Sequence, residues 1–154
     1  MKCLVRLFLV FTFIFAFTPL LFSQNKGIGA GVILGEPTAI SAKFWLGENN
    51  AVDAALGYSF DKGEKGISLH ADFVYHLRSI SDAELQFPLY YGFGLRFRAR
   101  EKAKGNFGVR GVIGILWWNT TPPIDVFFEL APVFKLFPST ELDLDAGIGA
   151  RYYF

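Results

Sequence analysis

The last fourteen residues of the chain, 141–154, alternate between two kinds of side chain without interruption. Because successive side chains of a β-strand point to opposite faces, this pattern predicts a strand with two different faces. The apolar face carries Leu142, Leu144, Ala146, Ile148, Ala150, Tyr152 and Phe154. The polar face carries Glu141, Asp143, Asp145, Gly147, Gly149, Arg151 and Tyr153. A two-faced strand that ends in an aromatic residue is typical of transmembrane β-barrels.

Seven further alternating segments precede this strand: 27–34, 39–46, 51–60, 67–77, 87–98, 107–118 and 124–137. Gly, Pro, Asn and Asp mark nearly every boundary, as turns require. The segment lengths suit tilted membrane strands, which need about 9–11 residues. The chain therefore predicts an all-β fold, an eight-stranded antiparallel up-and-down barrel. Pro132 cannot donate a ladder hydrogen bond, so we expect a bulge or a strand end there.

The first 23 residues have the features of a cleavable secretory signal. Lys2 and Arg6 form a basic start, and residues 7–22 are almost wholly apolar. We expect cleavage after Ser23, which leaves 24–154 as the barrel. The alternative is an uncleaved anchor helix. Cys3 is the only cysteine and lies in this segment, so the mature protein is expected to lack disulfides, thiol chemistry and cysteine metal sites.

Alternation alone leaves open which face points outward. A soluble barrel of the lipocalin kind would turn its apolar face inward. The polar face here is rich in glycine, which suits the crowded interior of a narrow barrel. Apolar residues make up 52% of the chain and aromatics 18%, yet no internal apolar run reaches the roughly 20 residues of a membrane helix. These features favour the membrane arrangement, with the apolar face in lipid.

Aromatic residues of the apolar face are expected to gather at two rims, as in the girdles of membrane barrels. One rim would carry Phe44, Tyr75, Tyr91, Trp117, Tyr152 and Phe154. The other would carry Tyr58, Phe60, Phe97, Phe107 and Phe134.

From residue 27 to its end the sequence resembles small eight-stranded outer-membrane barrels of the OmpA/OmpX type. The terminal Ala150-Arg-Tyr-Tyr-Phe154 resembles the signal that such proteins present to the barrel-assembly machinery, which would assign that role to Tyr152 and Phe154. The turn Gly35-Glu-Pro-Thr38 resembles uncharacterised families of short bacterial barrels. The resemblance implies a bacterial outer membrane. One departure is that the usual long extracellular loops are missing.

Charged residues lie on the face expected to point inward. The cations are Lys43, Arg96, Arg98, Arg110, Lys135 and Arg151. The carboxylates are Asp53, Asp72, Asp125, Glu129, Glu141, Asp143 and Asp145. Buried charges must be paired, and the lumen of eight strands is only wide enough for its side chains to fill. We therefore predict a packed ion-pair network and a closed lumen; a narrow, leaky water path is the alternative.

Ser68, His70 and Asp72 are the nearest approach to a catalytic set. They alternate along one strand, about 6.6 Å apart, whereas a nucleophile and its base must approach within roughly 3 Å. His70 and His76 are too far apart to share a metal ion. We expect no catalytic residues, no cofactor and no metal site.

Arg98, Arg100, Lys102 and Lys104 cluster between the fifth and sixth segments. They are candidate contacts for anionic lipid phosphates; a solvated polar loop is the alternative. The formal charge of +1 gives no reason to expect nucleic acid. The expected partners are outer-membrane lipids and the assembly machinery, and we expect a monomer. The function predicted is a non-enzymatic barrel that is structural or binds a lipid or other surface ligand. A lipid-modifying enzyme and a low-conductance channel are the alternatives.

Overall fold

The computed structural model describes residues 27–59, 66–77, 87–100 and 104–154. Its strands are β1 (Ile28–Glu36), β2 (Thr38–Trp45), β3 (Asn50–Ser59), β4 (Gly66–His76), β5 (Leu89–Arg100), β6 (Asn106–Thr120), β7 (Pro123–Phe137) and β8 (Glu141–Tyr153). Each predicted segment corresponds to one strand, so the predicted all-β fold is confirmed. The expected signal peptide, 1–23, lies outside the described residues. Among the residues that are described, no helix is long and apolar enough to cross a membrane.

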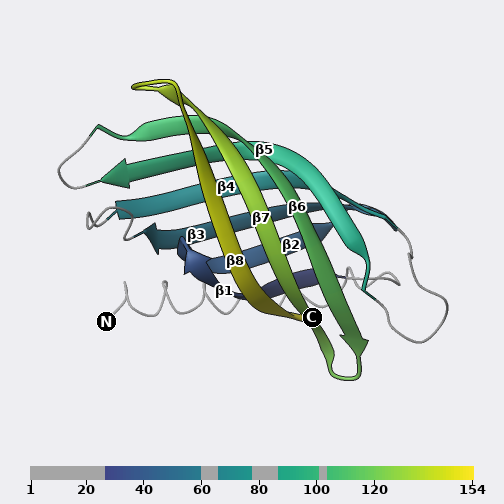
Figure 1. Ribbon diagram of the computed structural model, residues 1–154. Coiled ribbons are helices and arrows are strands. Elements are labelled where there is room, and N and C mark those ends of the chain that lie inside the picture. The colour runs from purple at the N-terminus through teal and green to yellow at the C-terminus, as the bar shows by residue number, and fades with distance from the viewer. Residues whose placement is uncertain (1–26, 60–65, 78–86, 101–103) are drawn as a thin grey trace, which may run out of the picture.

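The eight strands form one closed barrel in chain order (Figure 1). Each strand pairs antiparallel with the next, and β8 closes the barrel against β1, from the pair Gly29–Tyr153 to the pair Glu36–Ala146. The predicted up-and-down topology is therefore confirmed. We call the end with the turns after β1, β3, β5 and β7 the hairpin rim. The opposite end, with the turns after β2, β4 and β6, is the terminal rim.

Burial follows the alternation of the sequence. Along β4 every second residue is buried, without exception, from Gly66 to His76. The exposed positions of the barrel carry large apolar side chains, such as Phe93 (68% exposed) and Ile113 (58%), whereas the buried positions include most of the charged residues. Apolar residues thus point outward and polar residues inward, the arrangement of membrane barrels rather than of lipocalins.

Aromatic side chains of the outer face lie near the two rims as expected. Near the terminal rim the rings of Tyr75 and Tyr91 are 5.9 Å apart and those of Tyr152 and Phe154 are 5.2 Å apart. Near the hairpin rim the register places Tyr58, Phe97, Phe107 and Phe134 on strands that pair close to their turns. Phe60, predicted for the same rim, lies outside the described residues.

Local irregularities differ from the sequence expectation. Pro132 lies inside β7 and marks neither a bulge nor a strand end, so that prediction was wrong. Pro132 points outward near Gly111, where an added β-carbon would lie 3.7 Å from Pro132 Cγ, an ordinary contact. The register of β6 and β7 shifts instead between Phe107 and Gly108. The four-residue turn expected at 35–38 is also shorter, because β1 extends through Glu36.

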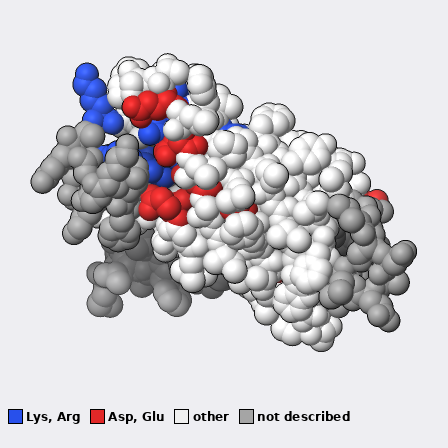
Figure 2. All heavy atoms as spheres, viewed as in Figure 1, with Lys and Arg blue, Asp and Glu red and all other residues white. Residues whose placement is uncertain are grey.

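The wall of the barrel is unequal in height at the hairpin rim. Pairing of β8 with β1 stops at Ala146, whereas pairing of β8 with β7 continues to Glu141. In Figure 1 the β7–β8 hairpin accordingly rises beyond the end of β1. We call the low part of the wall, between residues 141–145 of β8 and the β1–β2 turn at Pro37, the wall notch. Figure 2 shows acidic and basic side chains gathered at this end of the barrel, while the middle of the same face is uncharged.

Candidate functional site in the barrel interior

Glycines on the inward face make room for larger side chains beside them. A β-carbon at Gly94 would lie 2.2 Å from Asp72 Oδ1, and one at Gly114 would lie 2.3 Å from the ring of Tyr90. Both distances are far below van der Waals contact. Glycine at these positions therefore allows long polar side chains to fill an interior that is only about one side chain wide.

Arg110 on β6 is the centre of the charge group near the hairpin rim. Its guanidinium donates hydrogen bonds to Asp72 Oδ2 at 2.9 Å, Asp145 Oδ2 at 3.0 Å and Glu129 Oε1 at 2.7 Å. All four side chains are buried. The carboxylates come from β4, β8 and β7, so one planar fork of donors connects strands across the interior.

Two further arginines extend this group along β5. Arg96 donates to Asp145 Oδ1 at 2.6 Å and to Asp143 Oδ2 at 2.8 Å. Arg98 donates to Asp145 Oδ1 at 3.2 Å, and its Nη2 lies 3.5 Å from Glu36 Oε1 at the wall notch. Asp145 thus pairs with three guanidinium groups at once.

Lys135 on β7 extends the group to the rim itself. Its Nζ lies 3.3 Å from Glu141 Oε2 and 3.4 Å from Asp143 Oδ2. The side chains of Glu141 and Asp143 are 56% and 23% exposed, whereas that of Lys135 is 8% exposed. At this rim, solvent therefore meets carboxylates first, with the cation behind them.

A second charge group lies toward the terminal rim and is centred on Arg151. Its Nε lies 3.1 Å from both carboxylate oxygens of Asp125, and its Nη1 lies 3.3 Å from Asp53 Oδ2. The guanidinium also lies 4.0 Å above the centre of the Phe127 ring. The hydroxyl of Tyr153 donates to Asp125 Oδ2. Arg151 is therefore paired on one side and packed against an aromatic face on the other.

Lys43 completes this second group. Its Nζ lies 3.2 Å from Asp53 and 3.0 Å from His76 Nε2, and 5.1 Å from the ring centres of both Trp45 and Tyr90. Because an ammonium group only donates, His76 Nε2 is the acceptor and Nδ1 carries the proton. This proton is directed at a backbone carbonyl oxygen 3.2 Å away.

Tyr90 connects the two groups. Its ring contacts the ammonium of Lys43 in one group, and its hydroxyl donates to Glu129 Oε2 at 3.1 Å in the other. The ring of His76 stacks against that of Tyr90 at 5.3 Å. Charged and aromatic side chains thus form a continuous set of contacts from one end of the lumen to the other.

The structure places every residue predicted for the interior network on the inward face, and each has an ion-pair partner among the others. These residues are Lys43, Asp53, Asp72, Arg96, Arg110, Asp125, Glu129, Lys135, Asp143, Asp145 and Arg151. The network is divided into two groups, which the sequence pattern did not predict.

Three of the four basic residues predicted to contact anionic lipid are described by the structure, and they differ in burial. Arg98 is 1% exposed and pairs with carboxylates inside the barrel, so its assignment to a lipid contact was wrong. The alternating pattern had already placed it on the inward face. Arg100 is partly buried, Lys104 is exposed, and Lys102 lies outside the described residues. A lipid contact at these remaining positions stays a prediction.

Three participants in the network were missed by sequence reasoning. Tyr90 and Tyr153 are inward and bond to carboxylates, although each occupies a polar-face position in a rim region where aromatics were expected to face lipid. The sequence did contain a signal for them, because both tyrosines fall on the polar face of the alternating pattern, which predicts that they point inward. Glu36 was assigned to a turn, whereas the structure includes it in β1 and places its carboxylate 3.5 Å from Arg98 Nη2.

The possible catalytic set on β4 does not assemble. Asp72 is bonded to Arg110, and the register places Arg98 beside Ser68 and Arg96 beside His70. Ser68 Oγ and His70 Nδ1 have no hydrogen-bond partner within the described part of the chain. They therefore form neither a nucleophile–base pair nor a base–carboxylate pair.

The remaining predicted residues lie at the terminal rim. Tyr152 and Phe154 both point outward, and their rings meet edge to face. A role in recognition by assembly machinery stays a prediction. In the described ranges, no three or more His, Cys, Asp or Glu residues are grouped so as to hold a metal ion.

No protein-family model matches the chain, and no curated protein matches its sequence. Among solved structures, the fold is similar to that of the N-terminal β-barrel domain of Pseudomonas aeruginosa OprF, with a TM-score of 0.58. The similarity covers 82% of this chain and 95% of that chain, at 15% sequence identity. At this identity the two share a fold and nothing further is implied. The predicted resemblance to small eight-stranded outer-membrane barrels is confirmed at that level.

Proposed function

We propose that this chain is an integral outer-membrane barrel, exported by its first 23 residues, that acts without catalysis through its outer surface and rims. Its role is then structural or the binding of a lipid or surface ligand. One combination of features carries the proposal. The outer surface is apolar on all eight strands, and the interior is filled by two linked ion-pair groups. Such an interior favours a plug over a pore, because opening it would break several buried ion pairs together.

The lipid-binding form of the proposal has a candidate contact at the hairpin rim. Lys104 is exposed there and Arg100 is partly exposed. Cations near an anionic membrane surface contribute about 1 kcal/mol each to attraction. With Lys102 they would contact phosphate groups of the outer leaflet. Replacement of Arg100, Lys102 and Lys104 by Gln should then lower the amount of anionic lipid that co-purifies with the barrel.

The closed interior is tested by conductance. The purified protein should migrate differently on gels before and after heating, as folded barrels do, and the same sample should then be added to planar lipid bilayers. We expect no discrete current steps, because Arg110 and Arg151 hold carboxylates from several strands across the lumen. Reproducible single-channel steps from a heat-modifiable sample would show that the interior is open and that the protein is a channel.

A further inference from the structure

The apolar outer surface is much shorter on β1 than on β6. On β1 it runs from Ile28 to Leu34, and on β6 it runs from Phe107 to Trp117. With a rise of about 3.3 Å per residue and a strand tilt of about 40°, these lengths correspond to about 15 Å and about 25 Å along the barrel axis. A membrane barrel has an apolar band about 25 Å tall. The β6 side therefore matches a membrane, whereas the β1 side is about 10 Å too short.

The missing height on this side lies at the hairpin rim, where polar residues continue the outward row. The outward apolar residues end at Leu34 on β1 and at Ile40 on β2. The next positions of the same alternation are Glu36 and Thr38, at the two ends of the β1–β2 turn. The side chain of Glu36 is 37% exposed and lies 3.5 Å from Arg98 Nη2. Polar groups thus take the place of apolar ones at this level.

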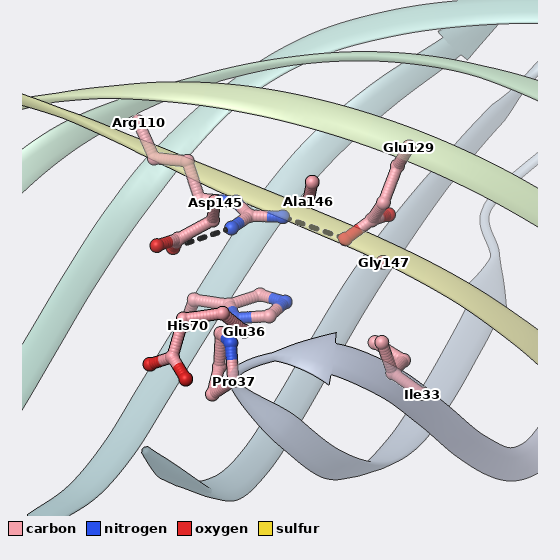
Figure 3. A pocket seen from close by; sticks show the side chains of 9 residues that line it. All are labelled: Ile33, Glu36, Pro37, His70, Arg110, Glu129, Asp145, Ala146 and Gly147. Carbon is pink, nitrogen blue, oxygen red and sulfur yellow. Dashed lines mark hydrogen bonds and ion pairs between the residues drawn. The ribbon is translucent and has the colours of Figure 1, made fainter. Parts of the chain in front are cut away.

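On the other side of the wall notch, β8 keeps its apolar outer face. Leu142 and Leu144 lie beyond Ala146, the partner of Glu36, and are 76% and 62% exposed. Leu142 is four residues beyond Ala146, which is about 10 Å along the barrel axis. In Figure 3 the turn with Glu36 and Pro37 lies below the strand that carries Ala146. The apolar surface therefore drops by about 10 Å between two neighbouring strands.

The backbone of β8 beside the notch also requires a polar environment. From Glu141 to Asp145 one edge of this strand pairs with β7, and no strand among the described residues pairs with the other edge. The backbone N–H of Leu144 donates to the side chain of Asp143 at 3.2 Å. Open sheet edges do not occur in the hydrocarbon of a membrane, because unpaired backbone groups are too costly there. Water or polar lipid groups must therefore reach this edge.

We propose that the barrel thins the membrane leaflet at its hairpin rim beside β1 and β2, where polar lipid headgroups and their water descend to the wall notch. A short apolar surface draws the bilayer to its own height. The headgroup layer then meets the carboxylates of Glu36 and Asp143 and the open edge of β8. This inference rests on the proposed membrane location and adds to it a surface that acts on the lipid.

Two matched positions on opposite sides of the barrel test the proposal. Leu34 and Leu95 each lie six residues after the first residue of their strands, Ile28 and Leu89, and both strands begin at the terminal rim. Both leucines are exposed. Beyond Leu95, however, the outward row stays apolar for four more residues, to Ala99. A probe at Leu95 should therefore lie about 10 Å deeper in the leaflet than one at Leu34.

The depth is measured with nitroxide labels on the mature chain, 24–154, refolded in lipid vesicles. This chain has no cysteine of its own, so Leu34→Cys and Leu95→Cys each carry one label. Oxygen concentrates in hydrocarbon, whereas a nickel chelate stays in water. We expect the Leu34 label to be reached by nickel and the Leu95 label by oxygen. Labels at Ile28 and Leu89 should have equal depths, because the leaflet at the terminal rim is not thinned.

The other outcomes distinguish this inference from the membrane location on which it rests. Leu34 and Leu95 labels that are equally deep in hydrocarbon would overturn the thinning and leave the membrane location standing. Nickel access without oxygen access at both would overturn the membrane location as well. Unequal depths of the Ile28 and Leu89 labels would show that the barrel tilts, and would overturn the thinning. Gel mobility before and after heating shows for each sample that the barrel is folded.

A variant that lengthens the short side provides a second test. Glu36→Leu combined with Thr38→Leu extends the apolar row by one outward position on each strand and should move the Leu34 label deeper, by about 5 Å. Glu36→Gln is the matched control: it removes the charge but keeps a polar side chain, so the depth of the label should not change. An unchanged depth in the folded leucine variant would contradict the proposal.

Discussion

Replacing Arg110 by Met should lower the free energy of unfolding by about 3–5 kcal/mol, the cost of removing one partner from a buried ion pair. The reason is the number of charges left behind. Arg110 donates to three buried carboxylates, of Asp72, Glu129 and Asp145, and methionine offers them no donor. Asp145 retains Arg96, whereas the carboxylate of Asp72 has no other ion pair among the described residues. Reversible urea unfolding in lipid vesicles, followed by tryptophan fluorescence, measures the effect.

Lys104→Met is the matched control, because it removes one positive charge from an exposed position. In vesicles that contain no anionic lipid it should change the unfolding free energy by less than about 0.5 kcal/mol. A double-mutant cycle with Glu129→Gln isolates the direct pair. The Arg110→Met change should cost at least about 1 kcal/mol less in the Glu129→Gln background. Equal and small effects of Arg110→Met and Lys104→Met would mean that the interior is hydrated and the ion pairs contribute little.

Replacing Ile113 by Arg should also destabilise the barrel strongly, for the opposite reason. Ile113 is the central residue of β6 and is 58% exposed on the outer face. If that face lies in lipid, an arginine near the middle of the bilayer costs about 2–4 kcal/mol. The measurement is again the urea midpoint of the protein refolded in lipid vesicles.

The control introduces an arginine at the rim instead, at Leu142. Leu142 is more exposed than Ile113 but lies second in β8, beside the β7–β8 turn. Leu142→Arg should cost only about 0–1 kcal/mol, because the side chain reaches the interface. In a soluble barrel both side chains would face water. The two substitutions would then cost the same unfolding free energy, and that result would contradict the membrane arrangement.

The strands were predictable because one rule governs all of them. The apolar–polar alternation in β3, β4 and β8 is regular, and Gly, Pro or Asn separates most segments, so strand number and inward face follow from period two. Irregularities were not predictable in the same way. The register shift at Phe107–Gly108 depends on how β6 meets β7, and no local pattern predicts that β7 continues through Pro132.

Which charges pair across the lumen depends on strand stagger, and no local pattern contains this information. Arg110 and Asp72 are not on paired strands, yet they bond at 2.9 Å. The alternation could identify both as inward but not as partners. The wall notch was not predicted for a related reason: it exists because β8 pairs with β1 only as far as Ala146, whereas it pairs with β7 as far as Glu141.

The central claim is that the apolar face of this barrel lies in lipid and the polar face is sealed inside. Two neighbouring tryptophans test it directly, because Trp117 is exposed on the outer face and Trp118 packs against the buried core and lies 4.6 Å from the Tyr153 ring. Two proteins are needed, each with one tryptophan left and phenylalanine at the other two positions. In vesicles of lipid brominated near the headgroup end of the acyl chain, we predict strong quenching of Trp117 and little quenching of Trp118. Equal quenching of the two, or quenching of Trp118 alone, would contradict the account.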